Sequence, residues 1–302
     1  MKFLALVLLL STFSSLTLME VVKDFARSSC SKFFIRSPNS KPVITPTVFK
    51  GYQYKKICQR WNKKYTFATL YDIKQRIPVY SAYTFSGDGP KLDQSKSEWK
   101  NEPQLENMSN GPDMREISDA EMDEFFHQAV NRDYRDSVKS TNISYTRGHV
   151  FPNGYAADQD QADSTYTFTN VAPQTKPSNN KWAEQVEEPM KGVIKNKCKL
   201  NDSNPAFIVT GVVPGNKWIK IKRYAKRTIK TFKEGVNIPS FYWTAFCCYI
   251  KEKTTFSGVY LVRQIEPNNT PEKIPKNVDE LNQRLSSLYN KDFKVFSNLC
   301  LT

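Results

Sequence analysis

Histidine is scarce in this chain of 302 residues, and glycine is also sparse. The two histidines, His127 and His149, limit imidazole chemistry to two positions. None of the six cysteines forms a Cys-x-x-Cys pair, which argues against a zinc ribbon. Beyond the first residues, no stretch approaches the about 18 apolar residues of a membrane-spanning helix, so we expect a soluble mature chain with no membrane span. No repeat of fixed period is present, which argues against a repeat architecture.

The first 19 residues have the pattern of a secretory signal peptide. Lys2 supplies a positive charge, Phe3 to Leu10 form an apolar run too short to cross a bilayer, and small or polar residues follow. We therefore expect a secreted, extracellular protein. Its mature part, residues 20–302, is expected to be a single domain because no linker divides it.

An even number of cysteines in a secreted chain indicates disulfide bonds. Cys30 and Cys300 lie near the ends and suit the fastening of the termini, whereas the adjacent Cys247 and Cys248 are expected to pair elsewhere. The pairing itself cannot be derived from the sequence. Sequons that suit a glycoprotein begin at four asparagines: Asn107, Asn142, Asn201 and Asn268.

Basic residues outnumber acidic ones by 44 to 30, which gives a net charge of +14. This balance favours polyanionic partners, nucleic acid above all, although a solvated basic surface is the plainer alternative. Residues 217–233 hold eight Lys or Arg and no acid, with Trp218 and Tyr224 among them. This run could follow a phosphate backbone or could be a solvated face. No motif that reads bases is visible, so we expect no sequence specificity.

Strands and helices mix without the regular spacing of βαβ units, which favours an α+β fold. Tyr65–Tyr71 and Ile77–Phe85 predict a hairpin. Further strands are expected at Phe207–Val213, Phe241–Ile250 and Thr254–Val262, the last interrupted by Gly258, and a helix at Val278–Leu288. Residues 91–117 look like a long loop anchored by Trp99 and Pro103.

A capping-box spacing at Ser118 and Glu121, followed by an apolar stripe, predicts a helix over about 119–131. His127 falls off this stripe and is expected at the surface. Strands are predicted at 142–149 and 164–169, and a helix follows Pro177 with Pro189 kinking or dividing it.

The sharpest chemical signal is His149. A neutral imidazole can take a proton from water, and Arg147, two residues away, falls on the same face of a strand, where its permanent charge could bind phosphate. The pair suits phosphodiester hydrolysis, although a structural histidine beside an ordinary ion pair is the alternative. Asn170 and Asn179 offer oxygen ligands for Mg²⁺, or act as turn and cap residues.

These residues carry a resemblance to the ββα-metal, DNA/RNA non-specific endonuclease family. The family signature begins with Asp-Arg-Gly-His and Asn-x-x-Pro-Gln, and continues with a metal-binding Asn, a Trp and a Glu. This chain matches it at Thr146–His149, Asn170–Gln174, Asn179, Trp182 and Glu187. More narrowly, the chain resembles the secreted endonuclease domain-containing 1-like proteins of vertebrates. The stretches that support this narrower resemblance occur in the family's order along most of the mature chain. They are Tyr65–Asp72, Arg76–Tyr83, Trp99–Leu105, His149–Asp158 and Thr167–Gln174.

The resemblance implies a central antiparallel sheet flanked by helices and a metal-dependent endonuclease that cleaves DNA, RNA or both. His149 would be the general base, and Arg147 would contact phosphate. Asn179 would bind Mg²⁺, with Mn²⁺ or Ca²⁺ as substitutes, and Asn170 would fix the geometry. Glu187 lies about 12 Å along a regular helix from Asn179, so it would hold metal-bound water rather than the ion.

Two departures bear on these assignments. Thr146 stands where the family has Asp, which removes a carboxylate from the site. Trp182 is one residue closer to Asn179 than the family pattern implies, so Asn180 and Glu184 remain rival assignments. A catalytically weakened module that binds extracellular nucleic acid or a protein partner is therefore the alternative function.

Overall fold

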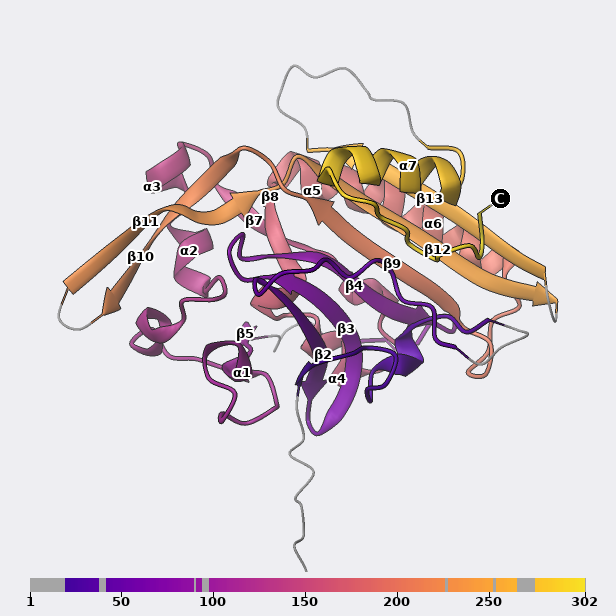
Figure 1. The fold of residues 1–302 in the computed structure, drawn as a ribbon, viewed down its shortest axis with the longest axis horizontal. Helices are drawn as coiled ribbons and strands as arrows, with labels where there is room; N and C mark the ends of the chain where they lie inside the picture. The colour runs from indigo at the N-terminus through magenta and orange to yellow at the C-terminus, as the bar shows by residue number, and fades with distance from the viewer. Residues whose placement is uncertain are drawn as a thin grey trace, which may run out of the picture.

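A seven-stranded antiparallel sheet forms the centre of the molecule (Figure 1). The computed structural model describes residues 20–37, 42–89, 91–93, 98–225, 228–251, 254–264 and 275–301. The strands lie in the order β1 (Val21–Val22), β2 (Tyr54–Trp61), β3 (Lys64–Asp72), β4 (Ile77–Phe85), β9 (Ala206–Val213), β12 (Phe241–Lys251) and β13 (Thr254–Arg263). The expected α+β class with a central antiparallel sheet is confirmed. The expected signal peptide lies outside the described residues.

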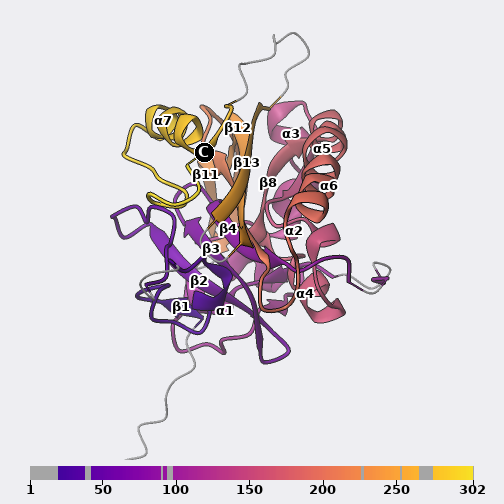
Figure 2. The ribbon, with the colours of Figure 1, turned by 90° about the vertical axis from the view of Figure 1, so that its right-hand side faces the viewer.

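Helices cover both faces of this sheet (Figure 2). α7 (Val278–Tyr289) buries Leu281 and Leu285 on one face, against Trp243 of β12. α5 (Lys176–Trp182) and α6 (Glu188–Lys197) lie over the other face, where Trp182 packs against Tyr242 with ring centroids 5.7 Å apart. Successive side chains of a strand point to opposite faces, so neighbouring residues of β12 reach different helices.

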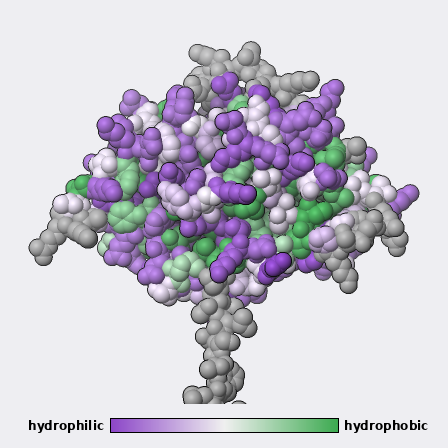
Figure 3. Space-filling model, viewed as in Figure 1, coloured by the Kyte–Doolittle hydropathy of each residue, from purple (hydrophilic) through white to green (hydrophobic). Residues whose placement is uncertain are grey.

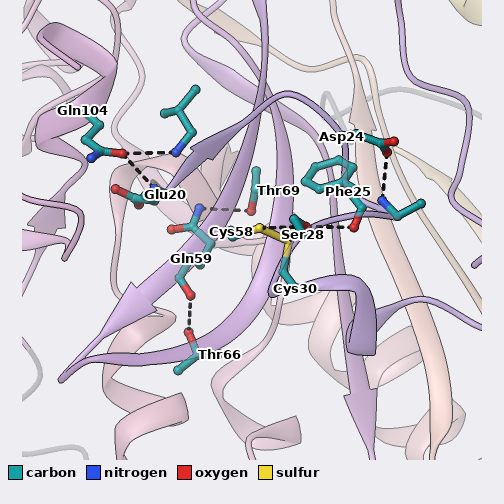
Figure 4. Close-up of a disulfide and its surroundings, with 12 residues drawn as sticks. Glu20, Asp24, Phe25, Ser28, Cys30, Cys58, Gln59, Thr66, Thr69 and Gln104 are labelled. Atoms are coloured by element: carbon teal, nitrogen blue, oxygen red, sulfur yellow. Dashed lines mark hydrogen bonds between the residues drawn. A yellow bond between two sulfur atoms is a disulfide. The ribbon is translucent and has the colours of Figure 1, made fainter. Parts of the chain in front are cut away.

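The same alternation explains the adjacent cysteines. Cys247 pairs with Cys300 near the C-terminus, whereas Cys248 pairs with Cys198, which caps α6. Cys30 pairs with Cys58 of β2 and fastens the N-terminal segment (Figure 4). The expectation that the two adjacent cysteines pair elsewhere is confirmed, and each terminus is fastened to the sheet separately.

The remaining elements lie outside this sheet. They are η1 (Ser31–Phe33), β5 (Lys100–Asn101), α1 (Pro103–Glu106), β6 (Arg115–Glu116), η2 (Glu121–Glu124), α2 (Asn131–Arg135), α3 (Val138–Thr141), β7 (Tyr145–His149), η3 (Asn153–Tyr155), α4 (Gln159–Ser164), η4 (Phe168–Asn170), β8 (Val171–Thr175), η5 (Ala183–Glu187), β10 (Lys217–Ala225) and β11 (Thr228–Ile238). Among the described residues, no helix is long and apolar enough to cross a membrane.

The helix predicted over 119–131 is wrong. The capping contacts do form, since the Ser118 hydroxyl and amide both donate to Glu121, but helical structure ends after the short turn η2. Tertiary partners take the next backbone groups: Arg223 donates to the carbonyl of Phe125 and Arg76 to that of Phe126. Hydrogen bonds from buried arginines thus replace those that would have continued the helix.

The strand predicted over 164–169 is also wrong. The Ser164 and Thr165 side chains bond back to carbonyls of α4, and the strand β8 begins only at Val171. β2 was missed, because its lysines and arginine obscure the alternation. Gly258 does not interrupt β13; it lies opposite Phe246, whose ring leaves no room for a Cβ atom.

Polar side chains dominate the outer surface. Figure 3 shows hydrophilic residues over most of one face. The asparagines of three sequons, Asn107, Asn142 and Asn201, are exposed, whereas Asn268 lies outside the described residues. These three sites are accessible for glycosylation.

Two carboxyl groups are buried together between β1 and β5. Glu20 and Glu102 are both fully buried, and Glu20 is held through its backbone N–H, which donates to Gln104 (Figure 4). Glu102 accepts hydrogen bonds from Thr167 and Thr169 through one oxygen only. Burial raises the pKa of both carboxyls, and their proximity raises the pKa of Glu20 further. The fold therefore favours their protonated forms.

Replacing Glu102 with Gln is expected to stabilise the protein above neutral pH. A raised folded pKa contributes stability that is full below the unfolded value of about 4.3 and is lost as pH rises through the folded pKa. Thermal melts of Glu102→Gln and wild type should coincide near pH 4 and separate by about 3 °C or more at pH 8. Glu124→Gln, at an exposed position, is the control. A lower melting temperature of Glu102→Gln at pH 8 would refute the buried acid pair.

Candidate active site

The hairpin of β7 and β8 carries the candidate histidine. The register pairs His149 with Val171 and Arg147 with Pro173, so Arg147 and His149 share one face, as predicted. Gly148 faces the opposite way. A Cβ atom there would lie 2.3 Å from the Gln174 side chain and 2.9 Å from the Tyr242 hydroxyl, so the strand can approach the sheet only with glycine at this position.

The His149 ring lies between two aromatic side chains and is half-buried. Its centroid is 5.5 Å from that of Trp99 and 5.0 Å from that of Tyr166. The Nε2 atom is buried and has no hydrogen-bond partner within the part of the chain that the structure describes. Burial, helped by the nearby Arg147 charge, lowers the pKa of His149 to about 4. The imidazole is therefore neutral at pH 7, with an unused nitrogen.

Arg147 points into a cage of aromatic rings. Its guanidinium lies over Trp99 at 5.0 Å and over Tyr134 at 5.6 Å, and it donates to the side chain of Asn131 in α2. The Nε atom has no partner among the described residues, and burial lowers the pKa of this guanidinium. In this arrangement Arg147 fixes Trp99, and Trp99 in turn flanks His149.

A cavity of about 350 Å³ opens next to this cage. Trp99, Asn131 and Phe168, all neighbours of Arg147, form part of its wall. The acidic side chains of Glu98, Glu116 and Asp119 also line it. Three negative groups disfavour a bound phosphate, so we do not assign the substrate to this cavity.

Asn170 is fully buried, and hydrogen bonds within the fold engage both ends of its amide. The oxygen accepts from the Ser81 hydroxyl at 3.0 Å and the Phe151 amide at 2.9 Å. The nitrogen donates to the carbonyls of Phe151 and Thr165, each at 3.0 Å. The side chain ties the segment after His149 to β4 and to the end of α4. It positions the histidine strand and has no oxygen free for a metal.

Thr146, which stands where the family has Asp, makes a hydrogen bond across the hairpin. Its hydroxyl donates to the carbonyl of Gln174, its partner residue in β8, at 2.8 Å. A deprotonated carboxylate cannot donate to a carbonyl, so the threonine makes a hairpin contact that the family residue could not make.

A π-helical turn sets the direction of Glu187. The turn η5 joins α5 to α6, and the amide of Glu188 donates to the carbonyl of Ala183, five residues back, as in a π-helix. Pro189 follows, and a proline at this place cannot donate to the previous turn. The expected disturbance by Pro189 is thus a one-residue bulge rather than a break.

This bulge brings Glu187 towards the face of Asn179. Eight residues of regular α-helix turn about 800°, which leaves the two side chains about 80° apart. One inserted residue reduces the separation to seven helical residues, about 700°, which is within about 20° of two full turns. Tyr155 fixes the turn, since its hydroxyl donates to the Glu187 carbonyl at 2.6 Å.

Asn179 and Glu187 are both half-buried, whereas the rival Asn180 and Glu184 are exposed. Burial raises the pKa of Glu187 to about 7, with Glu188 adding to the rise and the Trp182 indole opposing it. Asn179 makes no side-chain hydrogen bond to another residue in the described ranges, in contrast to Asn170. Its amide oxygen is therefore available to a ligand.

The structure thus forms two pairs of candidate residues. Arg147 and His149 meet at Trp99. Helix geometry with the bulge places Asn179 and Glu187 on one face. α5 packs directly on β7 and β8, which makes the unit a hairpin followed by a helix. No group of three or more His, Cys, Asp or Glu that could hold a metal occurs among the residues described, so an ion here would depend on the amide of Asn179.

Comparison with known proteins identifies this unit. The family model of DNA/RNA non-specific endonucleases matches residues 46–298. The chain belongs to this family. The match spans the sheet, the hairpin and the helix, so the ββα-metal architecture expected from the motif is confirmed.

Two curated relatives are similar over most of this chain. The human Endonuclease domain-containing 1 protein is 30% identical over 226 residues, and the mouse protein of the same name is 27% identical over 227 residues. Each alignment covers 73% of this chain and 39% of the relative, so the chain spans about two fifths of their length.

A solved endonuclease shares the fold. A chain from the crystal structure of the EndoG/EndoGI complex superposes with a TM-score of 0.51 at 14% identity, covering 80% of this chain and 87% of that one. At this identity the likeness concerns the fold alone. It places this family member within the ββα-metal nuclease architecture.

An NMR titration should show His149 unprotonated where an ordinary histidine is charged. We expect a midpoint near pH 4 for His149, with little protonation at pH 6, because the buried ring cannot be solvated as a cation. Since this folded pKa is lowered, its stabilising contribution is present above about pH 6.5 and is lost as pH falls through the folded value.

Only two histidines contribute signals, and His149→Gln assigns them. The other signal comes from His127, which contacts Glu106 at 2.9 Å and is 44% exposed. A His149 midpoint at pH 6.5 or above would contradict the burial of the Nε2 atom.

Proposed function

We propose that this protein is a secreted, metal-dependent, sequence-tolerant endonuclease that hydrolyses phosphodiester bonds of DNA, RNA or both. The observation that carries the proposal is the Nε2 atom of His149, which is buried and unpartnered among the described residues. A buried polar atom without a partner costs free energy, and functional sites are where such atoms persist. Family membership supplies the reaction class.

His149 would act as the general base. Trp99 and Tyr166 hold its ring, and the hydrogen bonds of Asn170 fix the chain after it. A ring with a pKa of about 4 is fully unprotonated at neutral pH and can accept a proton from an attacking water. The negative charge of a bound phosphate favours the imidazolium and would strengthen this base during the reaction.

The donor set on the helix that packs on the histidine strand fits a hard divalent ion. Asn179 offers a free amide oxygen and Glu187 a carboxylate on the same helical face, both half-buried. Mg²⁺ prefers oxygen ligands and keeps several waters, so few protein ligands are needed; Mn²⁺ or Ca²⁺ could substitute. Bound there, the ion would stabilise negative charge on the phosphate and the leaving oxygen.

Arg147 would act through its position beside the histidine. Its charge lies within the aromatic cage and contributes a positive potential on the side of the hairpin where phosphate would bind. Direct contact with phosphate would require its guanidinium to leave Asn131. The sequence-derived role of Arg147 as a phosphate ligand therefore stays a proposal.

Three features support secretion. The expected signal peptide precedes the fold, three disulfides cross-link it, and sequons lie exposed on its surface. Disulfides of this kind form in oxidising compartments. The substrate would accordingly be extracellular nucleic acid.

Thr146 motivates a second function: a catalytically weakened module that binds extracellular nucleic acid or a protein partner. Its hydroxyl is engaged with Gln174, and no carboxylate replaces the missing family residue at this position. Such a module would bind polyanions in a salt-sensitive manner, with no turnover that depends on metal.

Replacing His149 with Ala should abolish cleavage while binding survives. We expect plasmid and RNA cleavage with Mg²⁺ to fall by about 100-fold or more, the usual contribution of a general base. The dissociation constant for nucleic acid should change by less than about threefold, because the ring contributes no charge at pH 7. Cleavage that is insensitive to His149→Ala would refute its role as the base.

The neighbouring asparagines provide a matched pair for the metal. Asn179→Ala should remove the metal-dependent activity, whereas Asn180→Ala, an identical change at an exposed position, should retain it. The reverse result would assign the ion to Asn180. Wild-type protein that leaves DNA and RNA intact with Mg²⁺, Mn²⁺ and Ca²⁺, yet binds them, would establish the non-catalytic module instead.

A further inference from the structure

β10 and β11 form a separate two-stranded antiparallel sheet, here called the ribbon (Figure 1). It extends from the main body at the left of Figure 1. β11 has 11 residues, which corresponds to about 35 Å of extended chain. The inner part is buried through Ile219, Ile221 and Val236, and a register shift between the two isoleucines adds to the local twist.

The exposed face of the ribbon is basic. Ile219, Ile221 and Arg223 alternate inward, so Lys220, Lys222 and Tyr224 point outward. Lys233 of β11 is also exposed, and Glu234 is the acid of this strand. Lys230 is exposed too, but it pairs with Arg223 and therefore lies on the other face of the ribbon.

Two large apolar side chains end this face. Tyr224 and Ile229 are directly paired across the strands and are 52% and 65% exposed. Basic residues around an apolar, exposed pair are the combination that contacts phosphates and base edges together.

A buried ion pair holds the ribbon in a fixed direction. Arg223 donates to both oxygens of Asp133 in α2, each at 2.7 Å, and the two side chains are 0% and 2% exposed. The edge of β10 is fixed as well, since the amide of Tyr224 donates to Asp123. A buried pair adds little net stability, so its consequence here is orientation.

The same short helix, α2, also contacts the candidate active site. Asn131, two residues before Asp133, accepts the hydrogen bond from Arg147, which lies over Trp99 beside His149. The ribbon and the histidine strand therefore share one five-residue support. A nucleic acid bound along the ribbon would be held in a defined position relative to His149.

We propose that the ribbon is a DNA-binding arm that lies in the major groove of double-stranded DNA and gives the enzyme a preference for that substrate. The major groove of B-form DNA is about 12 Å wide and admits a two-stranded ribbon. The major groove of A-form RNA is too deep and narrow for it, and a single strand offers no groove. This proposal rests on the proposed nuclease function and names its preferred substrate.

The test neutralises two outward lysines and measures binding to three substrates. Lys220→Gln/Lys222→Gln, made in a His149→Ala background to prevent cleavage, is compared with the parent on a 30-base-pair DNA duplex, its single strand and the RNA duplex. Duplex DNA affinity should fall about tenfold near 0.1 M salt, and the slope of log K against log salt should decrease by about 1.8. Affinity for the other two should change by less than about twofold.

A control with the same change in charge separates the arm from net charge. Lys197→Gln/Lys199→Gln removes two exposed lysines near the end of α6 and should leave the preference for duplex DNA unchanged. Adding Tyr224→Ser to the ribbon variant should weaken duplex binding further. Equal losses on all three substrates, or the same loss in the control, would overturn the arm and leave exposed lysines that only keep the ribbon edges from pairing.

Hydrolysis of bis(4-nitrophenyl) phosphate by proteins with His149 intact distinguishes failure of the arm from failure of the nuclease. This small substrate cannot reach the ribbon, so the ribbon variant should match wild type. If wild type cleaves DNA but the ribbon variant keeps its duplex preference, the arm is wrong and the nuclease stands. If wild type cleaves nothing, the nuclease is wrong, and selective loss of duplex binding still supports the arm.

Discussion

The candidate site depends on the hydrogen bonds of one buried amide. The side chain of Asn170 hydrogen-bonds to Ser81 in the central sheet, to Phe151 after the histidine strand and to Thr165 after α4. The Ser81 hydroxyl also contacts Thr69, but the backbone groups of Phe151 and Thr165 would otherwise be unpaired in the interior, at a cost of about 1–3 kcal/mol per group. A single side chain thus joins a long connection to the sheet and makes the hairpin a rigid base for His149.

The helix that completes the unit reaches its position by an irregularity. In a regular helix the side chain of Glu187 would be turned about 80° from that of Asn179. The π turn before Pro189 reduces this angle. Tyr155 binds the carbonyl of the turn, and its ring belongs to the same core as Phe151. The turn is therefore supported by the segment that follows the histidine, which couples the two halves of the site.

Much of the fold could be predicted because local patterns and tertiary packing agree there. Strands β3, β4, β9, β12 and β13 are short runs rich in apolar and β-branched residues. The motif placed Arg147 and His149 on one face. The helix expected over 119–131 failed because Arg223 and Arg76, distant in sequence, take its backbone carbonyls. The role of Asn131 could not be foreseen, since only the fold brings it to Arg147. Trp99 was expected as an anchor, but nothing in its neighbours indicated that it would contact the histidine.

The bond between Cys198 and Cys248 has a consequence for where the protein can work. Cys198 ends the helix that begins with the Asn179 and Glu187 segment, so this bond anchors the far end of the helix to the sheet. In a reducing cytosol the anchor would be absent, and the helix would rest on packing alone. A chain that stayed in the cytosol would lack this covalent restraint, so completion of the site is tied to an oxidising compartment.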